Sequence, residues 1–147
     1  MLKVFLSCSA LVLSFSFSDI LGVIETSRSG MLVQQQKLRA IAENVANINT
    51  VKTINGEAYQ QKKVVVKTDQ ATKRPYVAQI IEKEVAGQRI FDPTNANADE
   101  NGFVFVSDYS IAKEMTDMAE TRRLYEANAA VFSSAKQVAQ SIMNLGK

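Results

Sequence analysis

Residues 19–50 read DILGVIETSRSGMLVQQQKLRAIAENVANINT, and apolar side chains recur in and just before this stretch every seven residues. The series consists of Phe17, Ile24, Met31, Leu38 and Val45, with Ile20, Ile41 and Ile48 beside it. A seven-residue repeat keeps its members on one face of an α-helix, and such a face packs against another helix. We therefore predict an amphipathic helix over residues 19–50. Gly30 within it marks either a close helix contact or a bend, because glycine costs about 1 kcal/mol relative to alanine in a helix interior.

The C-terminal residues 108–147 carry a second helical pattern. No Gly or Pro interrupts the chain from Ser107 to Leu145, and Asp108 or Ser110 is suited to cap the start of a helix of about 35 residues, or about 50 Å. Its apolar positions again lie seven apart, in the series Met118, Tyr125, Phe132 and Ala139, with Leu124, Val131, Val138 and Leu145 on one flank and Ala135 and Ile142 close by. So broad an apolar stripe needs more than one neighbouring helix.

The middle residues 51–107 have the composition of β-strands. β-Branched and aromatic runs occur at residues 64–66, 77–85 and 103–106. They are separated by dipeptides that favour chain reversal, at Asn55-Gly56, Arg74-Pro75, Asp92-Pro93 and Asn101-Gly102. A small hairpin-type or irregular β segment is the expected result.

These patterns together predict a mainly α chain with a small β-rich insert. The long N- and C-terminal helices pair as a coiled coil, and the β segment projects outward from them. Two helices enclose a thin core, so much of the apolar stripe stays in contact with water unless further subunits cover it. We therefore expect the chain to associate with itself or with partner proteins.

Residues 1–18, MLKVFLSCSALVLSFSFS, admit more than one interpretation. One positive charge followed by a short, serine-rich apolar run resembles a secretory signal. Cys8 after Leu6-Ser7 resembles a lipidation site, although it lies close to the start of the chain. The same residues could instead extend the helix that follows.

The composition argues against several classes of function. The chain of 147 residues has a net charge of +2, no histidine and one cysteine, so it offers no basic face for nucleic acid and lacks the commonest general base and metal ligand. Glu82 and Glu84 flank Lys83 on a predicted strand and are interpreted as solvated. The loop from Asn97 to Asp108 resembles a calcium-binding loop, but its first and last ligand positions are poor and flanking helices are missing, so we interpret it as a polar turn. We predict no catalytic, cofactor-binding or metal-binding residues and no small-molecule substrate.

Short motifs along most of the chain resemble one protein family. Near the start these are Ser29-Gly30-Met31, the stretch IAENVANINT at residues 41–50 and NGEAY at residues 55–59. The later ones are Phe91-Asp92-Pro93, ADENGFV at residues 98–104, Glu114-Met115, Asp117-Met118, Tyr125-Glu126-Ala127-Asn128, Ser134-Ala135-Lys136 and Leu145-Gly146-Lys147. In this order and spacing they resemble the axial proteins of the bacterial flagellum, the rod and hook proteins, and the later motifs follow the order of its proximal rod members. The signal-like residues 1–18 depart from the family pattern.

The resemblance implies a structural subunit of the flagellar basal body and not an enzyme. Such subunits are exported from the cytoplasm by the flagellar type III apparatus, stack helically with other rod subunits and with themselves, and form a rod across the periplasm that transmits motor torque. The expected assembly interface comprises Ile24, Met31, Leu38, Ile41, Val45, Asn47, Asn49, Met115, Met118, Tyr125, Asn128, Val131, Phe132, Val138 and Ile142. The alternative, suggested by residues 1–18 and Cys8, is a secreted or lipid-anchored periplasmic binding module.

Overall fold

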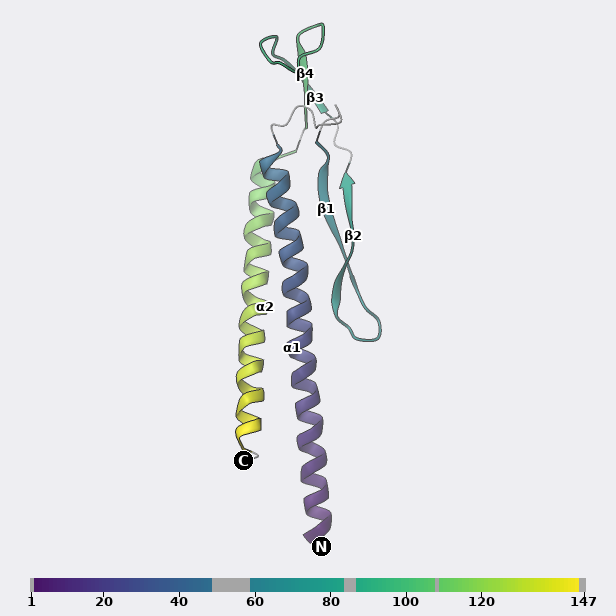
Figure 1. Cartoon of the computed structure of the whole chain (residues 1–147), viewed down its shortest axis with the longest axis vertical. Helices are drawn as coiled ribbons and strands as arrows, with labels where there is room; N and C mark the ends of the chain where they lie inside the picture. Colours follow the sequence, from purple (N-terminus) through teal and green to yellow (C-terminus); the bar gives the residue numbers. More distant parts are fainter. Residues whose placement is uncertain (1, 49–58, 84–86, 108, 146–147) are drawn as a thin grey trace.

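Two long helices form the body of the molecule. The computed structural model describes residues 2–48, 59–83, 87–107 and 109–145. Helix α1 (Leu2–Ala46) and helix α2 (Ile111–Leu145) run antiparallel and contact each other, so the start of α1 and the end of α2 lie at the same end of the molecule (Figure 1). Two antiparallel β-hairpins lie between them in the chain. The predicted pairing of terminal helices around a small β insert is thereby confirmed.

Helix α1 begins earlier than the apolar repeat indicated. It starts at Leu2, so residues 2–18 continue the helix predicted from residue 19. At its other end the side-chain amide of Asn47 donates to the carbonyl of Glu43 at 2.8 Å, which satisfies one of the terminal carbonyls that lack a partner within the helix. Within the described residues, neither helix contains a stretch both long and apolar enough to cross a membrane. The division of the chain at residues 18, 50 and 107 stays a prediction.

Helix α2 starts where its capping residue predicts. The Ser110 hydroxyl accepts a hydrogen bond from the backbone N–H of Lys113 at 3.4 Å, and the Ser110 carbonyl accepts from Glu114, so Ser110 is the N-cap. Glu114 lies in the first turn, where its negative charge suits the helix dipole. The other candidate cap, Asp108, and the predicted stop at Gly146 lie outside the described residues.

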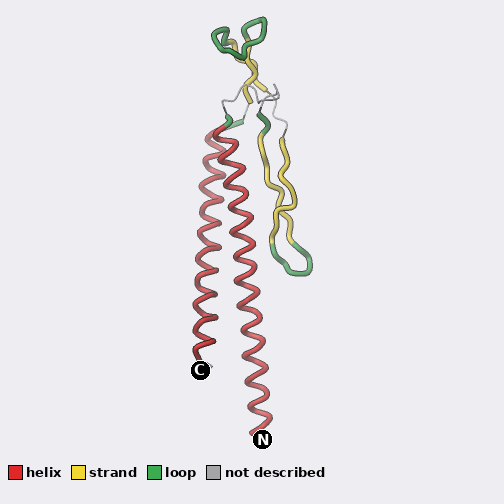
Figure 2. The backbone as a smooth tube through the Cα atoms, viewed as in Figure 1, coloured by secondary structure: helices red, strands yellow, loops and turns green. Residues whose placement is uncertain are grey.

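The first hairpin lies along α1 instead of projecting from it (Figure 2). Strands β1 (Gln61–Thr68) and β2 (Pro75–Lys83) pair from Gln61 with Lys83 to Thr68 with Pro75, with a bulge beside Val65 and Val66. The prediction of an outward β segment is wrong for this hairpin, because both strands contact α1, where Val77 lines a hollow with the buried Val33 and Ile80 lines one with the buried Ala40.

The second hairpin lies beyond the helix pair, at the end opposite the start of α1 (Figure 1). It consists of β3 (Gly87–Phe91) and β4 (Phe103–Ser107), which pair from Gly87 with Ser107 to Phe91 with Phe103. Gly102 in its turn has a φ of +79°, a conformation that favours glycine. Strand β3 was not predicted, because Gly87-Gln88-Arg89 lacks the β-branched signal of the other strands. The predicted turn Asn55-Gly56 and the end of the predicted strand at residues 84–85 lie outside the described residues.

The apolar core of the single chain is thin. Among the described side chains the fully buried apolar ones are Val33, Ala40, Val104 and Ala139, and the fully buried polar ones are Ser27, Asn44, Gln61, Glu114 and Thr121. An isolated domain of this size normally buries more of its Leu, Ile and Phe side chains. The fold therefore leaves most of its large apolar side chains available for other contacts.

Candidate assembly interface

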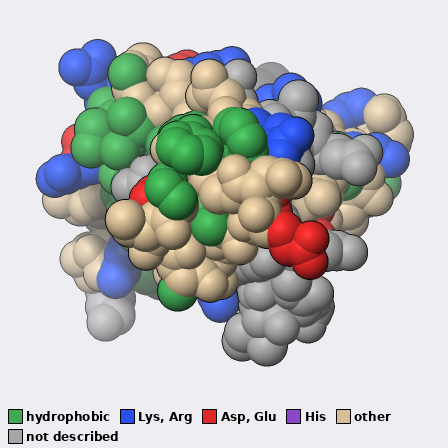
Figure 3. Space-filling view, turned by 90° about the horizontal axis from the view of Figure 1, so that it is seen from above, with side chains coloured by type: hydrophobic (Ala, Val, Ile, Leu, Met, Phe, Trp, Pro, Cys, Tyr) green, Lys and Arg blue, Asp and Glu red, His purple; other side chains and the backbone are tan. Residues whose placement is uncertain are grey.

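Large apolar side chains are exposed on both helices and on both hairpins in the described part of the chain. Among the described residues they are Leu21, Val23 and Leu32 on α1, Tyr76, Ile80, Ile81, Ile90 and Phe91 on the hairpins, and Ile111, Met115, Leu124, Tyr125, Val131, Val138 and Met143 on α2. Hydrophobic side chains also gather on the surface seen from the β3–β4 end (Figure 3). Exposed apolar surface on this scale is typical of a chain that binds other proteins.

One continuous ridge stands out on α2. Leu124, Val131 and Val138 are 44, 48 and 49% exposed and lie seven residues apart. Seven residues are nearly two helical turns, so the three side chains follow one another along one face at intervals of about 10 Å. This ridge, defined by Leu124, Val131 and Val138, runs beside the groove between the two helices, where Leu124 lies near Lys37 and Ile41 of α1.

The predicted interface residues fall into two groups. Met115, Tyr125, Val131 and Val138 are exposed and free to meet another subunit. The half-buried ones are Ile24, Met31, Leu38, Ile41, Val45, Asn47, Met118, Asn128, Phe132 and Ile142, and Asn49 lies outside the described residues. Each half-buried side chain is partly covered by the chain itself, and only its exposed part is left for contact with another subunit.

Gly30 allows α1 and α2 to approach closely. A Cβ atom added at Gly30 would lie 2.9 Å from the Oδ1 atom of Asn128 on α2. The Asn128 side chain is held there because its Nδ2 donates to the carbonyl of Leu124 at 2.9 Å. Of the two interpretations offered by the sequence, a close helix contact at Gly30 is confirmed. The expected place of Tyr125 and Asn128 in the assembly interface stays a prediction.

A buried polar cluster joins the helix pair to the first hairpin. Asn44 is 1% exposed, and its Nδ2 donates to Glu114 Oε2 and to the carbonyl of Lys62, each at 3.0 Å. Its Oδ1 accepts from the backbone N–H of Lys62 at 2.8 Å and from the Tyr59 hydroxyl at 3.1 Å. One side chain thereby connects α1, the start of β1 and α2. We call this cluster the polar junction; it comprises Asn44, Tyr59, Gln61, Lys62, Tyr109 and Glu114.

Glu114 completes the junction from the side of α2. Its carboxylate is buried, with 3% of the residue exposed, and accepts hydrogen bonds from Asn44 and from Gln61 Nε2. The Tyr109 hydroxyl donates to the backbone carbonyl of Asn44. A buried carboxylate is tolerated only when such donors replace water. The junction therefore fixes where the second helix begins relative to the end of the first.

Two phenols in the junction are held in their neutral form. Burial raises the pKa of Tyr59 to about 12, and three neighbouring carboxylates, that of Glu43 first, add to the effect. Burial likewise raises the pKa of Tyr109 to about 12, with smaller contributions from Tyr59 and Glu114. Both hydroxyls therefore stay donors throughout the physiological pH range.

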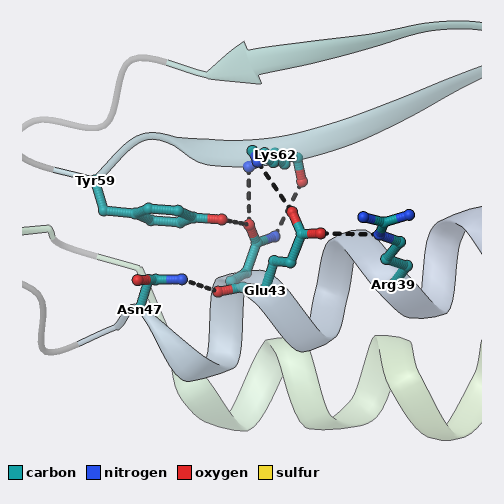
Figure 4. A network of polar contacts seen from close by, with 6 residues as sticks. Arg39, Glu43, Asn47, Tyr59 and Lys62 are labelled. Atoms are coloured by element: carbon teal, nitrogen blue, oxygen red, sulfur yellow. Dashed lines mark hydrogen bonds and ion pairs between the residues drawn. The ribbon is translucent and has the colours of Figure 1, made fainter. Parts of the chain in front are cut away.

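Glu43 forms the exposed edge of the same region (Figure 4). Its carboxylate accepts from Lys62 Nζ at 2.9 Å and from Arg39 Nε at 3.1 Å. These two hydrogen bonds, that of Lys62 first, hold the pKa of Glu43 below its usual value. Glu43 is the neighbour of Asn44 on α1, so its ion pair with Lys62 is a second contact that holds β1 against α1.

In the loop that resembles a calcium site, the carboxylate of Asp99 accepts hydrogen bonds from its own hairpin. Asp99 Oδ1 accepts from the backbone N–H groups of Asn101 and Phe103, each at 2.9 Å, and Oδ2 accepts from Arg89 at 3.0 Å. Asp108, the last proposed ligand, lies outside the described residues. In the described part of the chain no group of three or more Cys, Asp or Glu side chains is arranged to hold a metal ion.

Comparison with known proteins identifies the family. A family model described as "Flagella basal body rod protein" matches residues 24–51, and one described as "Flagellar basal body rod FlgEFG protein C-terminal" matches residues 100–145. The flagellar basal-body rod protein FlgC of Salmonella typhimurium is 30% identical over 132 residues, which cover 87% of this chain and 98% of the relative. The chain belongs to the FlgC family of flagellar basal-body rod proteins. FlgC of Aquifex aeolicus is 35% identical over 124 residues, covering 82% and 92%, and FlgC of Borreliella burgdorferi is 23% identical over 141 residues, covering 82% and 93%.

The FlgC family assignment confirms the resemblance drawn from the motifs and gives the polar junction a context. The two matched segments are the second half of α1 and the stretch from the β3–β4 turn through α2. Asn44 lies in the first segment and Tyr109 and Glu114 in the second, so the junction links the two parts that match rod proteins. The sequence analysis had quoted Asn44, Tyr59 and Glu114 within its motifs but had no signal that the three meet, because their separation in the chain hides it.

Proposed function

We propose that the chain is a structural subunit of the flagellar basal-body rod that assembles with further copies and with other rod subunits. It is a basal-body rod protein by family, and the relatives it matches are named flagellar basal-body rod protein FlgC. The single observation that supports assembly is the exposed apolar ridge of Leu124, Val131 and Val138, which an isolated chain would leave in water. Covering one such side chain contributes about 1.5 to 3 kcal/mol.

The terminal helices pair as a coiled coil in this proposal. On α2, residues spaced alternately by four and three are buried or half-buried, except Tyr125, which is 38% exposed. They are Glu114, Met118, Thr121, Tyr125, Asn128, Phe132, Ala135, Ala139 and Ile142. On α1 the same spacing holds for Ile20, Ile24, Ser27, Met31, Gln34, Leu38, Ile41 and Val45 and continues to Ile48 just after the helix, and all are buried or half-buried. Alternation of four and three is the spacing of a coiled-coil seam.

The mechanical role follows from a contact that does not close. When one surface of a subunit binds a different surface of the next and the rotation between them does not close a ring, repetition builds a helical filament. A rod built in this way, with the ridge of each subunit packed between neighbouring helices, is stiff in torsion and transmits motor torque from the basal body across the periplasm. The interface residues predicted from the sequence are proposed as its contacts. Delivery from the cytoplasm by the flagellar export apparatus belongs to the same proposal.

Catalysis has no part in the proposed function. The families that match the chain are structural rod families, and no catalytic family is among them. The chain has no histidine, and the buried carboxylate of Glu114 is engaged by amide donors that hold a fold together. We therefore propose no substrate, cofactor, metal or nucleic-acid partner.

A lipid-anchored periplasmic binding module is the competing proposal, and one variant separates the two. Cys8→Ser removes the only thiol of the chain. A rod subunit held by helix packing should keep its place and function in this variant, and acyl labelling should detect no lipid on the original chain. Acyl label that disappears in Cys8→Ser, together with loss of function, would favour the anchored module.

Deletion of the gene tests the proposed function without assumptions about folding. We expect loss of swimming and basal bodies without a completed rod, and recovery of both when the gene is supplied in trans. Leu38→Asp and Phe132→Asp should fail to restore swimming although the protein is made, because both side chains lie half-buried in the helix pair. Normal swimming and intact rods in the deletion strain would overturn the proposal.

A further inference from the structure

The two hairpins carry opposite net charges and lie at different places along the molecule, the first beside α1 and the second beyond the end of the helix pair (Figure 1). Residues 61–83, which form the β1–β2 hairpin, contain six basic and two acidic residues, a net charge of +4. Residues 87–107, which form the β3–β4 hairpin, contain one basic and three acidic residues, a net charge of −2. The turn of the first hairpin points toward the end where α1 starts, and the second hairpin lies beyond the other end (Figure 1).

The outer face of the β1–β2 hairpin is basic and partly apolar. In the antiparallel register Lys63 lies opposite Ile81 and Lys67 lies opposite Tyr76, and Tyr76 also lines a hollow with Leu32 and Val33 of α1. The alternate residues turn toward α1, as the Lys62 to Glu43 pair shows. Ile81 and Tyr76 are exposed, and the ammonium groups of Lys63 and Lys67 form no ion pair with any residue that the structure describes. The α1 contact leaves Lys63, Lys67 and Ile81 exposed, and these three define the outer face.

The β3–β4 hairpin offers the complementary combination. Phe91 is 63% exposed and Ile90 is 44% exposed, although Phe91 packs edge-on against Phe103 at 5.3 Å. Asp92 follows Phe91 directly and Glu100 lies in the turn, so both add negative charge to this hairpin, whereas Asp99 is paired with Arg89 at 3.0 Å. Exposed aromatic side chains bordered by charge are the usual composition of a protein interface.

We propose that the β3–β4 hairpin of one copy docks on the outer face of the β1–β2 hairpin of a second copy, stacking the copies head to tail along their long axes. This inference rests on the proposed function, since it names one contact by which copies assemble. Opposite net charge on the two hairpins favours contact between unlike hairpins of two copies and disfavours contact between like ones. The contact joins two different surfaces, so each copy can bind one copy on either side.

Paired charge reversals test the contact. Lys63→Glu with Lys67→Glu removes the basic outer face, and Gln88→Lys with Glu100→Lys reverses the second hairpin at two exposed positions that its turn does not use for hydrogen bonds. Placing like charges opposite each other should weaken the contact about tenfold or more. Each reversal alone should therefore reduce rod completion and swimming, and both reversals in the same chain should restore them. Lys63→Arg with Lys67→Arg keeps the charge and should behave as the original chain, while circular dichroism confirms that every variant is folded.

Disulfide cross-linking between copies tests the contact between the two hairpins directly. In a Cys8→Ser background, copies carrying Lys67→Cys and differently tagged copies carrying Glu100→Cys should form a mixed disulfide in cells, whereas Arg28→Cys with Glu100→Cys should not. The contact is overturned if neither reversal affects rods or swimming, or if the combined reversal fails to restore them and the cysteine pair does not cross-link. If the contact is overturned but rods still fail to form when the gene is deleted, the proposed function holds and only the contact is wrong. If rods form without the gene, the proposed function itself is wrong.

Discussion

Asn44→Ala should destabilise the chain more than any other single change to the polar junction. The substitution removes four hydrogen bonds of 2.8 to 3.1 Å and leaves the buried Glu114 carboxylate with one donor fewer. At a net contribution of about 1 kcal/mol for each bond, the loss is about 4 kcal/mol. The better helix propensity of alanine returns about 0.6 kcal/mol, so we expect a net loss of about 3 to 4 kcal/mol. This is a large fraction of a total stability of about 5 to 15 kcal/mol.

Urea denaturation followed by circular dichroism measures this loss. With an m-value of about 2 kcal/mol per molar urea, the midpoint should fall by about 2 M. Asn144→Ala is the matched control, because Asn144 is an exposed asparagine on α2 whose truncation should leave the midpoint unchanged. Asn44→Asp keeps the acceptor oxygen for Lys62 and Tyr59 but sets a second carboxyl group against Glu114, so its stability should improve as the pH is lowered. An Asn44→Ala midpoint equal to that of the original chain would refute the assignment of the junction as the link between helices.

Three further predictions concern the helix contact, the phenols and the projecting hairpin. Gly30→Ala should destabilise the chain by about 1 to 2 kcal/mol relative to Gly22→Ala. The reason is that a Cβ atom at Gly30 would lie 2.9 Å from the Asn128 side chain, whereas one at Gly22 would have no neighbour within 4 Å. Thermal melts of the two variants measure the difference. The free energy of unfolding should fall as the pH rises from about 10 to about 12, because Tyr59 and Tyr109 ionise more easily in the unfolded chain. In urea melts at several pH values, Tyr59→Phe and Tyr109→Phe should each show a smaller fall. The same fall in the variants as in the original chain would contradict the raised pKa of these two phenols. Gly102→Ala should cost about 1 to 3 kcal/mol within the β3–β4 hairpin, because φ is +79° there; hydrogen exchange should quicken in β4 and stay unchanged in α2.

The sequence predicts the helices well because their signals are local and repeated. The seven-residue series and the capping Ser110 placed both helices, and Gly30 indicated the close contact now seen with Asn128. The sequence left residues 1–18 open between a signal-like leader and an extension of the helix, and residues 2–18 are helical in the structure. Composition and periodicity cannot separate a signal-like run from an apolar helical extension.

The path of the first hairpin and the polar junction could not be predicted in the same way. Strand propensity identified β1 and β2 but not the surface they cover, since that depends on whether Val33 and Ala40 of α1 lie within reach. The junction brings together Asn44 and Glu114, which are 70 positions apart in the chain. No local sequence pattern around either residue indicates this contact. The exposed ridge was partly foreseen, because the flanking series on α2 was recognised as too broad for one neighbour.

Imaging of basal bodies that carry substitutions in the ridge tests the central claim most directly. In a strain without the gene, a copy with Val131→Asp and Val138→Asp should give folded protein but no completed rod, because two exposed apolar contacts become charged. The control, Ala130→Asp with Gln137→Asp, places the same charges one residue earlier on the same helix at exposed positions and should give complete rods and swimming. Complete rods and normal swimming with the ridge variant would contradict assembly through α2, whereas rods lost only in the ridge variant are the result we predict.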